Sequence, residues 1–501
     1  MTGKRIMEDP EKQSTSSSPV GSGWELYAVS ALFLAGLILR FFHLGHESVW
    51  LDEVLSYEFA RSSIVEIVRR TAADVHPPLY YLILHPFLSL GIREEILRLP
   101  SFLFGSLAIP LVYLIGRELY GKPQGLIAAL LLAFSPFHIF YSQEARMYPL
   151  FFFWVCLSTY LLILALRGGQ WRFWIGYALA TAFSLYTHYF TVFILLAQNL
   201  YVLIYWIRKD FQKGFLLRWL ASQGIILLVF APWLPVLLAQ YRSGKGEWMI
   251  RYFGYPGVRN ILETIRVFGT GPALPGTWLE AFSLLFLALA LLGLFFRGQV
   301  SPFHPGLFLG LSLFLPLFVV FLASLFKPAY QVKYLIGLYP FYLFLVSGGI
   351  FFFRRKWMKI ILAGLLLLSF AYPLYLHYSL VRGTTWREAN RLVALNYQDG
   401  DVVGFNAGYI SRIFQYYVDL NFRGRYMEMY RFPYFKSGES DLPKLKAEMV
   451  QLQYKYRRIW LLQAHSWDSD PYGIVVGYLS ENYSMVAKSR GDPELYLFRL
   501  K

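Results

Sequence analysis

Acidic side chains that could act on a bound substrate first appear in the stretch Ser48-Val-Trp-Leu-Asp-Glu-Val-Leu-Ser56, which follows an apolar run. Asp52 and Glu53 are adjacent carboxylates between apolar neighbours. An unpaired carboxylate in apolar surroundings is costly, so the pair favours a function. A carboxylate of this kind can act as the general base on an acceptor hydroxyl.

Asp74 and His76 follow in Asp74-Val-His-Pro-Pro-Leu-Tyr80, where two prolines restrict the backbone beside the histidine. With Asp52 they offer oxygen and nitrogen ligands, so a divalent metal held by Asp52, Asp74 and His76 is a minor hypothesis, because the spacing is not diagnostic. No cofactor is otherwise indicated. Three glutamates nearby are interpreted as ordinary solvated residues: Glu58, Glu94 and Glu95.

A second group lies in Phe140-Tyr-Ser-Gln-Glu-Ala-Arg-Met-Tyr148, between two long apolar runs. Glu144 and Arg146 are ionisable groups at a membrane boundary, which favours a functional role. An ion pair between them, or with a helix end, is the alternative interpretation.

A third group, in Phe326-Lys-Pro-Ala-Tyr-Gln-Val-Lys-Tyr334, contains Lys327 and Lys333. Lysine and arginine can neutralise the charge that develops on a phosphate leaving group. The alternative is that both lysines simply extend to the membrane interface.

The composition predicts a polytopic membrane protein that holds these groups on helices. Of 501 residues, 56% are hydrophobic and 16% charged, whereas an average soluble chain is about 45–50% apolar and 25% charged. A spanning helix needs about 20 apolar residues. Eleven windows meet this length: 24–43, 99–116, 123–140, 148–166, 172–188, 189–207, 216–238, 277–296, 305–326, 334–353 and 358–377.

The basic residues predict the orientation of these spans. Clusters such as Arg354-Arg-Lys356 occupy alternate loops, as expected for cytoplasmic anchors. This explains the net charge of +16 without nucleic-acid binding. It also places residues 44–98, the loop containing Glu144 and the segment containing Lys333 on the outer face, so all three groups are expected on one side of the membrane.

Three regions are predicted. Residues 1–23 read as a disordered cytoplasmic tail, and residues 24–378 as the membrane domain. Residues 379–501 alternate an amphipathic helix from Trp386 with apolar strands near 400–405, 458–463 and 495–500, which predicts a small extracytoplasmic α/β domain. The one cysteine, Cys156, excludes an intrachain disulfide and reads as a core or lipid-facing residue.

The ordered set of motifs resembles that of bacterial relatives of the protein O-mannosyltransferases and the lipid A aminoarabinose transferases, which are membrane glycosyltransferases of the C-type fold. The motifs are Trp50-Leu-Asp-Glu53, Asp74-Val-His-Pro-Pro-Leu-Tyr-Tyr81, Arg98-Leu-Pro-Ser101, Ser142-Gln-Glu-Ala-Arg-Met-Tyr148 and Lys333-Tyr-Leu335. The similarity covers the first 150 residues best and residues 326–340 less well.

The resemblance implies that a sugar moves from a polyprenyl-phosphate donor to a lipid, polysaccharide or protein acceptor at the outer face of the plasma membrane. It implies Asp52, Glu53 and Glu144 as catalytic residues. It implies donor-phosphate or substrate contacts from Arg146, Lys333, His76, Asp74, Tyr148 and Lys327. Relatives often have arginine in place of Lys333, which keeps the charge but lacks the bidentate fork.

A transporter or flippase of a lipid-linked or anionic solute is the alternative function. Transporters tend to place ionisable groups near the membrane midplane and to show repeated halves. Here the charged groups gather at the outer ends of the spans, and no repeat is visible. A scaffold protein would not need paired carboxylates in an apolar loop.

Overall fold

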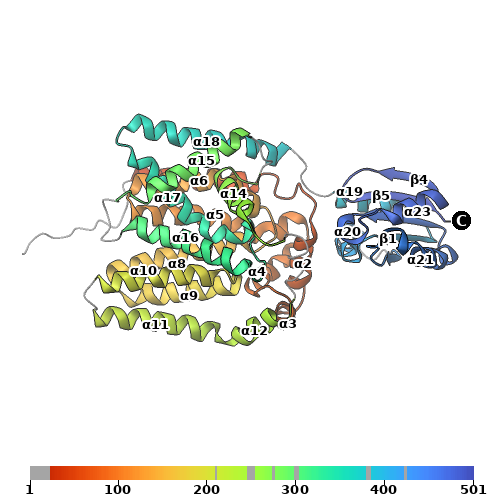
Figure 1. The fold of residues 1–501 in the computed structure, drawn as a ribbon, viewed down its shortest axis with the longest axis horizontal. Coiled ribbons are helices and arrows are strands. Elements are labelled where there is room, and N and C mark those ends of the chain that lie inside the picture. Colours follow the sequence, from red (N-terminus) through yellow and green to blue (C-terminus); the bar gives the residue numbers. More distant parts are fainter. Residues whose placement is uncertain are drawn as a thin grey trace, which may run out of the picture.

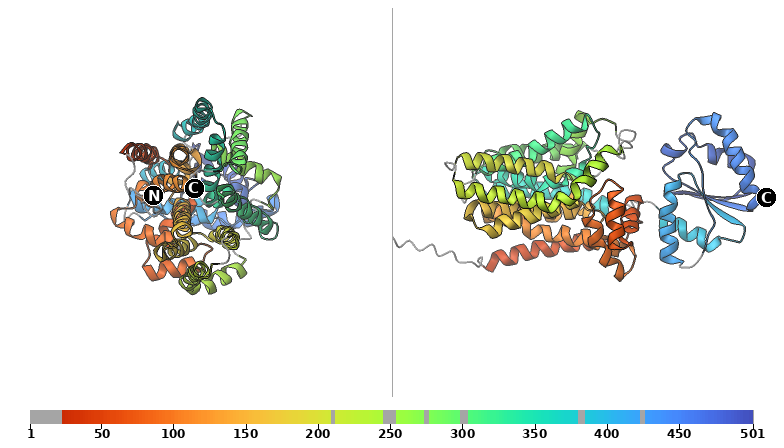
Figure 2. Two further views of the ribbon diagram at one scale, coloured as in Figure 1. Left: turned by 90° about the vertical axis from the view of Figure 1, so that its left-hand side faces the viewer. Right: turned by 90° about the horizontal axis from the view of Figure 1, so that it is seen from below.

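Long apolar helices form most of the chain, and a small sheet flanked by helices forms its C-terminal part (Figure 1). The computed structural model describes residues 23–208, 212–244, 254–272, 277–297, 304–379, 385–422 and 426–500. The predicted tail, apart from Gly23, lies outside these residues. The right-hand view in Figure 2 shows the sheet beyond one end of the helical part.

Seven described helices are long and apolar enough to cross a membrane. Five are single helices: α1 (Gly23–Phe41), α5 (Glu94–Leu119), α8 (Tyr148–Gly168), α16 (Pro305–Ser324) and α18 (Lys356–Ser379). The sixth, Lys213–Arg242, consists of α11 (Lys213–Phe230), η2 (Ala231–Trp233) and α12 (Leu234–Arg242). The seventh, Val332–Phe352, consists of η3 (Val332–Leu338) and α17 (Tyr339–Phe352). The bent pair α6 (Lys122–Phe134) and α7 (Pro136–Ser142) gives an eighth.

The remaining predicted windows are also helical, but these helices are shorter. They are α9 (Trp171–Thr187), α10 (Thr191–Ile207) and α15 (Thr277–Gly293). A polytopic helical protein is thus confirmed, while the count of eleven spans stays a prediction. Smaller helices of this part are α2 (Leu51–Ala60), α3 (Ile64–Ala72), α4 (Leu79–Phe87), η1 (Leu88–Leu90) and α14 (Val258–Thr270).

The bend of 56° between α6 and α7 is stabilised by a buried arginine from α1. Pro136 cannot continue the hydrogen-bond ladder of α6, so the last carbonyls of α6 need other donors. Arg40 donates to the backbone oxygens of Leu132 (2.9 Å) and Ala133 (3.0 Å), and its Nη2 lies 3.0 Å from Nδ1 of His138. This arrangement fixes α7 and the loop that follows it, which contains Glu144 and Arg146.

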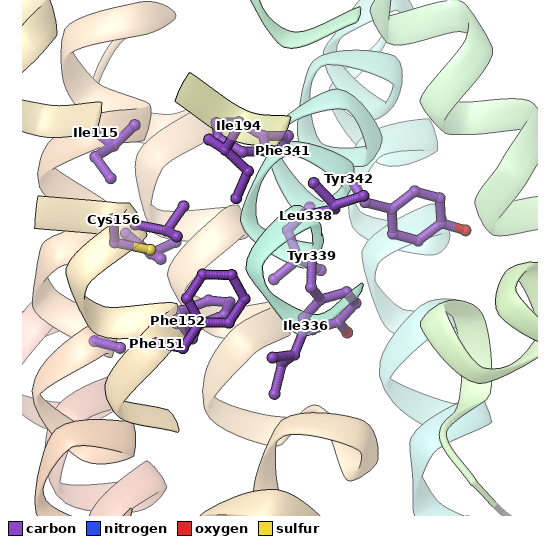
Figure 3. Close-up of a cluster of buried hydrophobic side chains, with 14 of the residues drawn as sticks. Ile115, Phe151, Phe152, Cys156, Ile194, Ile336, Leu338, Tyr339, Phe341 and Tyr342 are labelled. Carbon is purple, nitrogen blue, oxygen red and sulfur yellow. The ribbon is translucent and has the colours of Figure 1, made fainter. Parts of the chain in front are cut away.

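The core of the membrane part lies where α8 meets η3 and α17 (Figure 3). Phe151, Phe152 and Cys156 of α8 lie in this cluster, all fully buried, with Tyr339 of α17. Cys156 is therefore a core residue. A Cβ on Gly349 would lie 1.9 Å from the backbone oxygen of Leu289, so α15 and α17 approach too closely for any larger residue.

The C-terminal sheet has the strand order β2-β1-β3-β5-β4. Strands β2 (Met429–Arg431), β1 (Asp401–Phe405) and β3 (Arg458–Gln463) are parallel, and β5 (Glu494–Arg499) is antiparallel to β3 and β4 (Ser484–Ser489). Helices α19 (Trp386–Asn396) and α20 (Ser411–Asn421) pack on one face, and α21 (Leu442–Lys455) and α23 (Ile474–Asn482) on the other. The short elements η4 (Gly408–Ile410), η5 (Gly438–Asp441) and α22 (Ser466–Ser469) complete it.

This sheet unit packs directly on the segment that contains Asp52. Val49 and Val54 share one hydrophobic cluster with Trp386 and Tyr417. Glu94, expected to be solvated, is only 4% exposed: Arg387 pairs with it at 2.7 Å and the hydroxyl of Tyr417 donates to it at 3.0 Å. The expectation for Glu94 was wrong, because its charged partner comes from a segment about 290 residues away.

Candidate active site

Asp52 and Glu53 stand at the start of α2 but face different surroundings. The Glu53 carboxylate is fully buried, and it accepts from Nε and Nη2 of Arg98, both at 2.8 Å, and from the backbone N–H of Ala145 at 2.7 Å. These bonds join α2, α5 and the loop after α7. Glu53 therefore has the contacts of a structural tie, and little of its carboxylate is left for a substrate.

Asp52, in contrast, keeps a partly exposed carboxylate. Its side chain is 27% exposed, and its Oδ2 lies 3.7 Å from Nζ of Lys333. Burial alone would raise the pKa of Asp52, but Arg146, Lys333 and His76 outweigh it and hold the pKa below its usual value. The carboxylate is thus ionised at neutral pH and can accept a hydrogen bond or a proton.

Arg146 is a buried cation whose hydrogen-bond partners are neutral. It is 3% exposed and donates to the backbone oxygen of Asp52 (3.1 Å) and to Oγ of Ser56 (3.3 Å), and its Nη2 lies 3.3 Å from Nε2 of His76. Within the part of the chain that the structure describes, no carboxylate oxygen lies within ion-pair distance of it. A buried guanidinium in this situation is suited to a bound anion.

His76 connects Arg146 to Asp74. Its Nδ1 lies 2.9 Å from Oδ2 of Asp74, so we assign the Nδ1–H tautomer, in which Nε2 accepts from Arg146. Burial would raise the pKa of Asp74, but the hydrogen bond from His76 lowers it below its usual value. Both ring nitrogens are engaged, and no three His, Cys, Asp or Glu of the described ranges form a metal-binding group. A metal site of Asp52, Asp74 and His76 therefore stays a prediction.

Aromatic rings surround the ammonium group of Lys333. Its Nζ lies 5.5 Å from the ring centre of Trp50, 5.9 Å from that of Tyr148 and 5.6 Å from that of Tyr334. Such contacts stabilise a cation that is largely out of water. Lys327 lies elsewhere, because its Nζ donates to the backbone oxygen of Tyr241.

Several buried polar atoms around Asp52 have no hydrogen-bond partner among the described residues. They are Nε1 of Trp50, Oε2 of Glu144, Nε of Arg146 and Oη of Tyr148. Buried polar atoms are nearly always paired, so a concentration of unpaired ones is typical of a place that a polar ligand completes. Burial raises the pKa of Glu144 to about 8, and the nearby Glu53 adds to this. Its carboxyl is thus mainly protonated at neutral pH.

The structure brings together six of the nine predicted site residues around one place: Asp52, Asp74, His76, Arg146, Tyr148 and Lys333. Glu144 adjoins them, Glu53 points into the protein, and Lys327 contacts another helix. The sequence reasoning missed Ser56 and Tyr334. Ser56 stands four residues after Asp52 on one helix, a spacing that could have indicated it.

His188 also lies beside this site. Its ring stacks on Phe151 at 4.7 Å, and its Nδ1 accepts from the backbone N–H of Phe190 at 3.2 Å. Burial, with the nearby His76 and Arg146, lowers the pKa of His188 to about 3, so it is a neutral wall of the site.

Known proteins resemble this chain in part of its sequence and in its fold. Residues 75–235 match the family described as dolichyl-phosphate-mannose-protein mannosyltransferase, and this range includes His76 and Arg146. No curated protein sequence matches the chain.

Among solved structures, ArnT from Cupriavidus metallidurans in the apo state has a TM-score of 0.60 and 13% identity over 96% of this chain and 98% of that chain. The same protein bound to undecaprenyl phosphate has a TM-score of 0.59 and 12% identity, over 96% of this chain and 99% of that chain. The archaeal oligosaccharyltransferase AglB from Archaeoglobus fulgidus, in complex with an inhibitory peptide and a dolichol-phosphate, has a TM-score of 0.54 and 14% identity. The match covers 88% of this chain and 69% of that chain.

The chain thus has the fold of the C-type membrane glycosyltransferases. Within that class its fold is similar to that of ArnT, and residues 75–235 match the mannosyltransferase family model, in line with the resemblance of the motifs.

Proposed function

We propose that this protein is a glycosyltransferase that moves a sugar from a polyprenyl-phosphate donor to an acceptor hydroxyl at the outer face of the plasma membrane. The observation that carries the proposal is the buried Arg146 guanidinium, which has only neutral hydrogen-bond partners among the described residues and lies beside the ionised carboxylate of Asp52. A phosphate provides the anion that Arg146 lacks.

In the proposed reaction, Asp52 accepts the proton of the acceptor hydroxyl as its oxygen forms a bond to the anomeric carbon of the sugar. The bond between that carbon and the phosphate oxygen breaks, and polyprenyl phosphate leaves with the bonding electrons. Arg146 and Lys333 stabilise the negative charge that builds on the leaving phosphate. Nζ of Lys333 lies 3.7 Å from Oδ2 of Asp52, so the base and this cation are direct neighbours in the site.

The other residues position these groups. Asp74 orients His76, and His76 in turn holds Arg146. Glu53 and Arg98 fix the first turn of α2, which contains Asp52. Protonated Glu144 can donate a hydrogen bond to a sugar or phosphate oxygen without adding negative charge.

The undecaprenyl phosphate named for the ArnT structure supports a lipid phosphate as donor carrier. Helix α2, which contains Asp52, lies at the end of the helical part that is next to the sheet unit (Figure 1), and this supports a reaction at the membrane surface. We propose that this is the outer surface, because basic residues gather in the loops at the opposite end.

The test is transfer of radiolabelled sugar from a panel of polyprenyl-phosphate hexoses and pentoses, with purified protein in liposomes and mixed envelope lipids and glycans as acceptors. We compare wild type with Asp52→Asn and with Glu66→Gln, a control at an exposed ion pair with Arg70 on α3. Transfer by wild type and Glu66→Gln that Asp52→Asn loses supports the proposal. Saturable donor binding without transfer from any donor contradicts it and favours a transporter.

A further inference from the structure

The order of the strands in the C-terminal sheet places a switch point between β1 and β3. Helix α20, which follows β1, packs on the face that contains Val403 and Phe405. Helix α23, which follows β3, packs on the face that contains Ile459 and Leu461. Where neighbouring parallel strands lead to helices on opposite faces, ligands of open α/β sheets bind beyond the carboxyl ends of those strands.

The two loops at this switch point are fixed to each other. Asn406 follows β1 directly and is 1% exposed. Its side chain donates to Oγ of Ser469 at 2.9 Å and accepts from the backbone N–H of Ala464 at 3.0 Å, and both partners lie after β3. The loops after β1 and β3 are therefore held in place relative to each other before any ligand binds.

Polar groups and aromatic rings gather on these two loops and on the segment after β2, in what we call the edge cluster: Tyr409, Lys436, His465, Trp467 and Asp468. Oη of Tyr409 lies 3.0 Å from Nδ1 of His465 and 3.5 Å from Oδ2 of Asp468. Nζ of Lys436 donates to Oδ1 of Asp468 at 2.9 Å. Hydroxyl, imidazole, ammonium and carboxylate groups thus meet at one edge of the sheet.

Large aromatic side chains remain exposed around these polar groups. Trp467 is 61% exposed and its ring lies 6.0 Å from that of His465, while Tyr434 is 45% exposed beneath Lys436. His465 itself has a φ of 53°, which a residue other than glycine adopts at a cost. Strained residues of this kind cluster at ligand clamps.

The edge cluster is also close to the candidate active site. Arg412 stands three residues after Tyr409, and its guanidinium lies 3.1 Å from Oε2 of Glu58 on α2. Glu58 is six residues from Asp52, which is about 9 Å along a helix. A molecule held at the edge cluster therefore lies beside the helix that presents Asp52.

We propose that the edge cluster binds carbohydrate, namely the glycan part of the acceptor. A sugar ring has apolar C–H faces, which pack on an exposed ring such as Trp467, and hydroxyl edges, which pair with Tyr409, Lys436 and Asp468. The acceptor role rests on the proposed glycosyltransferase function, whereas carbohydrate binding by itself does not.

The test measures direct binding by the full-length protein in lipid nanodiscs, without donor. The probes are chitotriose, mannotriose and an arabinofuranose trisaccharide, followed by ligand-observed NMR and calorimetry. We compare wild type with Trp467→Ala and Tyr409→Phe. Tyr454→Ala is the matched control, because Tyr454 is 88% exposed on α21.

We expect at least one probe to bind, with affinity about tenfold weaker in Trp467→Ala, about threefold weaker in Tyr409→Phe and unchanged in Tyr454→Ala. Asp52→Asn should bind the probe like wild type, which separates this proposal from failure of the catalytic one. Absence of binding by all three probes overturns the proposal, as does binding that both edge-cluster variants leave unchanged or that only Asp52→Asn removes.

Discussion

The adjacent residues Asp52 and Glu53 should respond in opposite ways to the same chemical change. Glu53→Gln removes the negative charge that faces Arg98, whose side chain is 4% exposed and is held by two bonds of 2.8 Å. Breaking a buried ion pair from one side costs about 3–5 kcal/mol. Asp52→Asn breaks one ion-pair contact, of 3.7 Å, at a partly exposed group that Arg146 and His76 also face at longer range, and for such a group about 1 kcal/mol or less is expected.

The expected shift in melting temperature follows from chain length. An unfolding entropy of about 2.1 cal/mol/K per residue gives about 1 kcal/mol/K for 501 residues. Glu53→Gln should therefore lower Tm by about 3–5 °C, and Asp52→Asn by about 1 °C or less. The assay is thermal unfolding in detergent, followed by size-exclusion chromatography, with sugar transfer measured on the same samples.

Glu53→Gln should keep part of its transfer activity below its lowered Tm, whereas Asp52→Asn should lose transfer. A Glu53→Gln protein with unchanged Tm and no transfer would refute this reasoning, because Glu53 would then be the base.

Three further changes test other parts of the site. Arg146→Leu should raise the donor KM about 10- to 150-fold, because a hydrogen bond to a charged group contributes about 1.5–3 kcal/mol of binding free energy. An unchanged KM in steady-state kinetics would exclude a contact between Arg146 and the donor phosphate. With a pKa of about 8, Glu144 loses its proton as pH rises through 8, so the transfer rate should fall there, while the stability linked to its neutral form should fall from its ordinary pKa of 4.5 up to about 8. Glu144→Gln should show neither fall in pH profiles of rate and Tm, and an identical profile would contradict the assignment. Tyr417→Phe removes the hydroxyl oxygen that accepts from the backbone N–H of Val49 at 2.8 Å, just before α2. Because this bond joins the sheet unit to α2, its loss should lower kcat about 3- to 10-fold at constant donor KM. An unchanged kcat would show that the sheet unit does not position α2.

The residue types of the site could be predicted from sequence, because ionisable groups in apolar segments are costly enough to indicate function. The different roles of Asp52 and Glu53 could not. Successive residues of a helix point about 100° apart, so one carboxylate faces Arg98 and the other faces Lys333, and both partners are distant in sequence.

The same limit applies to the C-terminal sheet. Strands β1, β3 and β5 are buried on both faces, and their apolar runs predicted them. Strand β4 is largely exposed and β2 has three residues, so neither has a pattern that separates it from a loop. The switch point between β1 and β3 depends on strand order, which composition does not determine.

The most direct test of the central claim measures donor binding and sugar transfer separately in wild type, Asp52→Asn and Arg146→Leu. Binding of a polyprenyl-phosphate sugar to each protein in nanodiscs is followed by release of free polyprenyl phosphate after acceptor is added. Asp52→Asn should bind donor without turning it over, and Arg146→Leu should bind donor weakly. Normal binding and turnover in both variants would contradict a site built from Asp52 and Arg146.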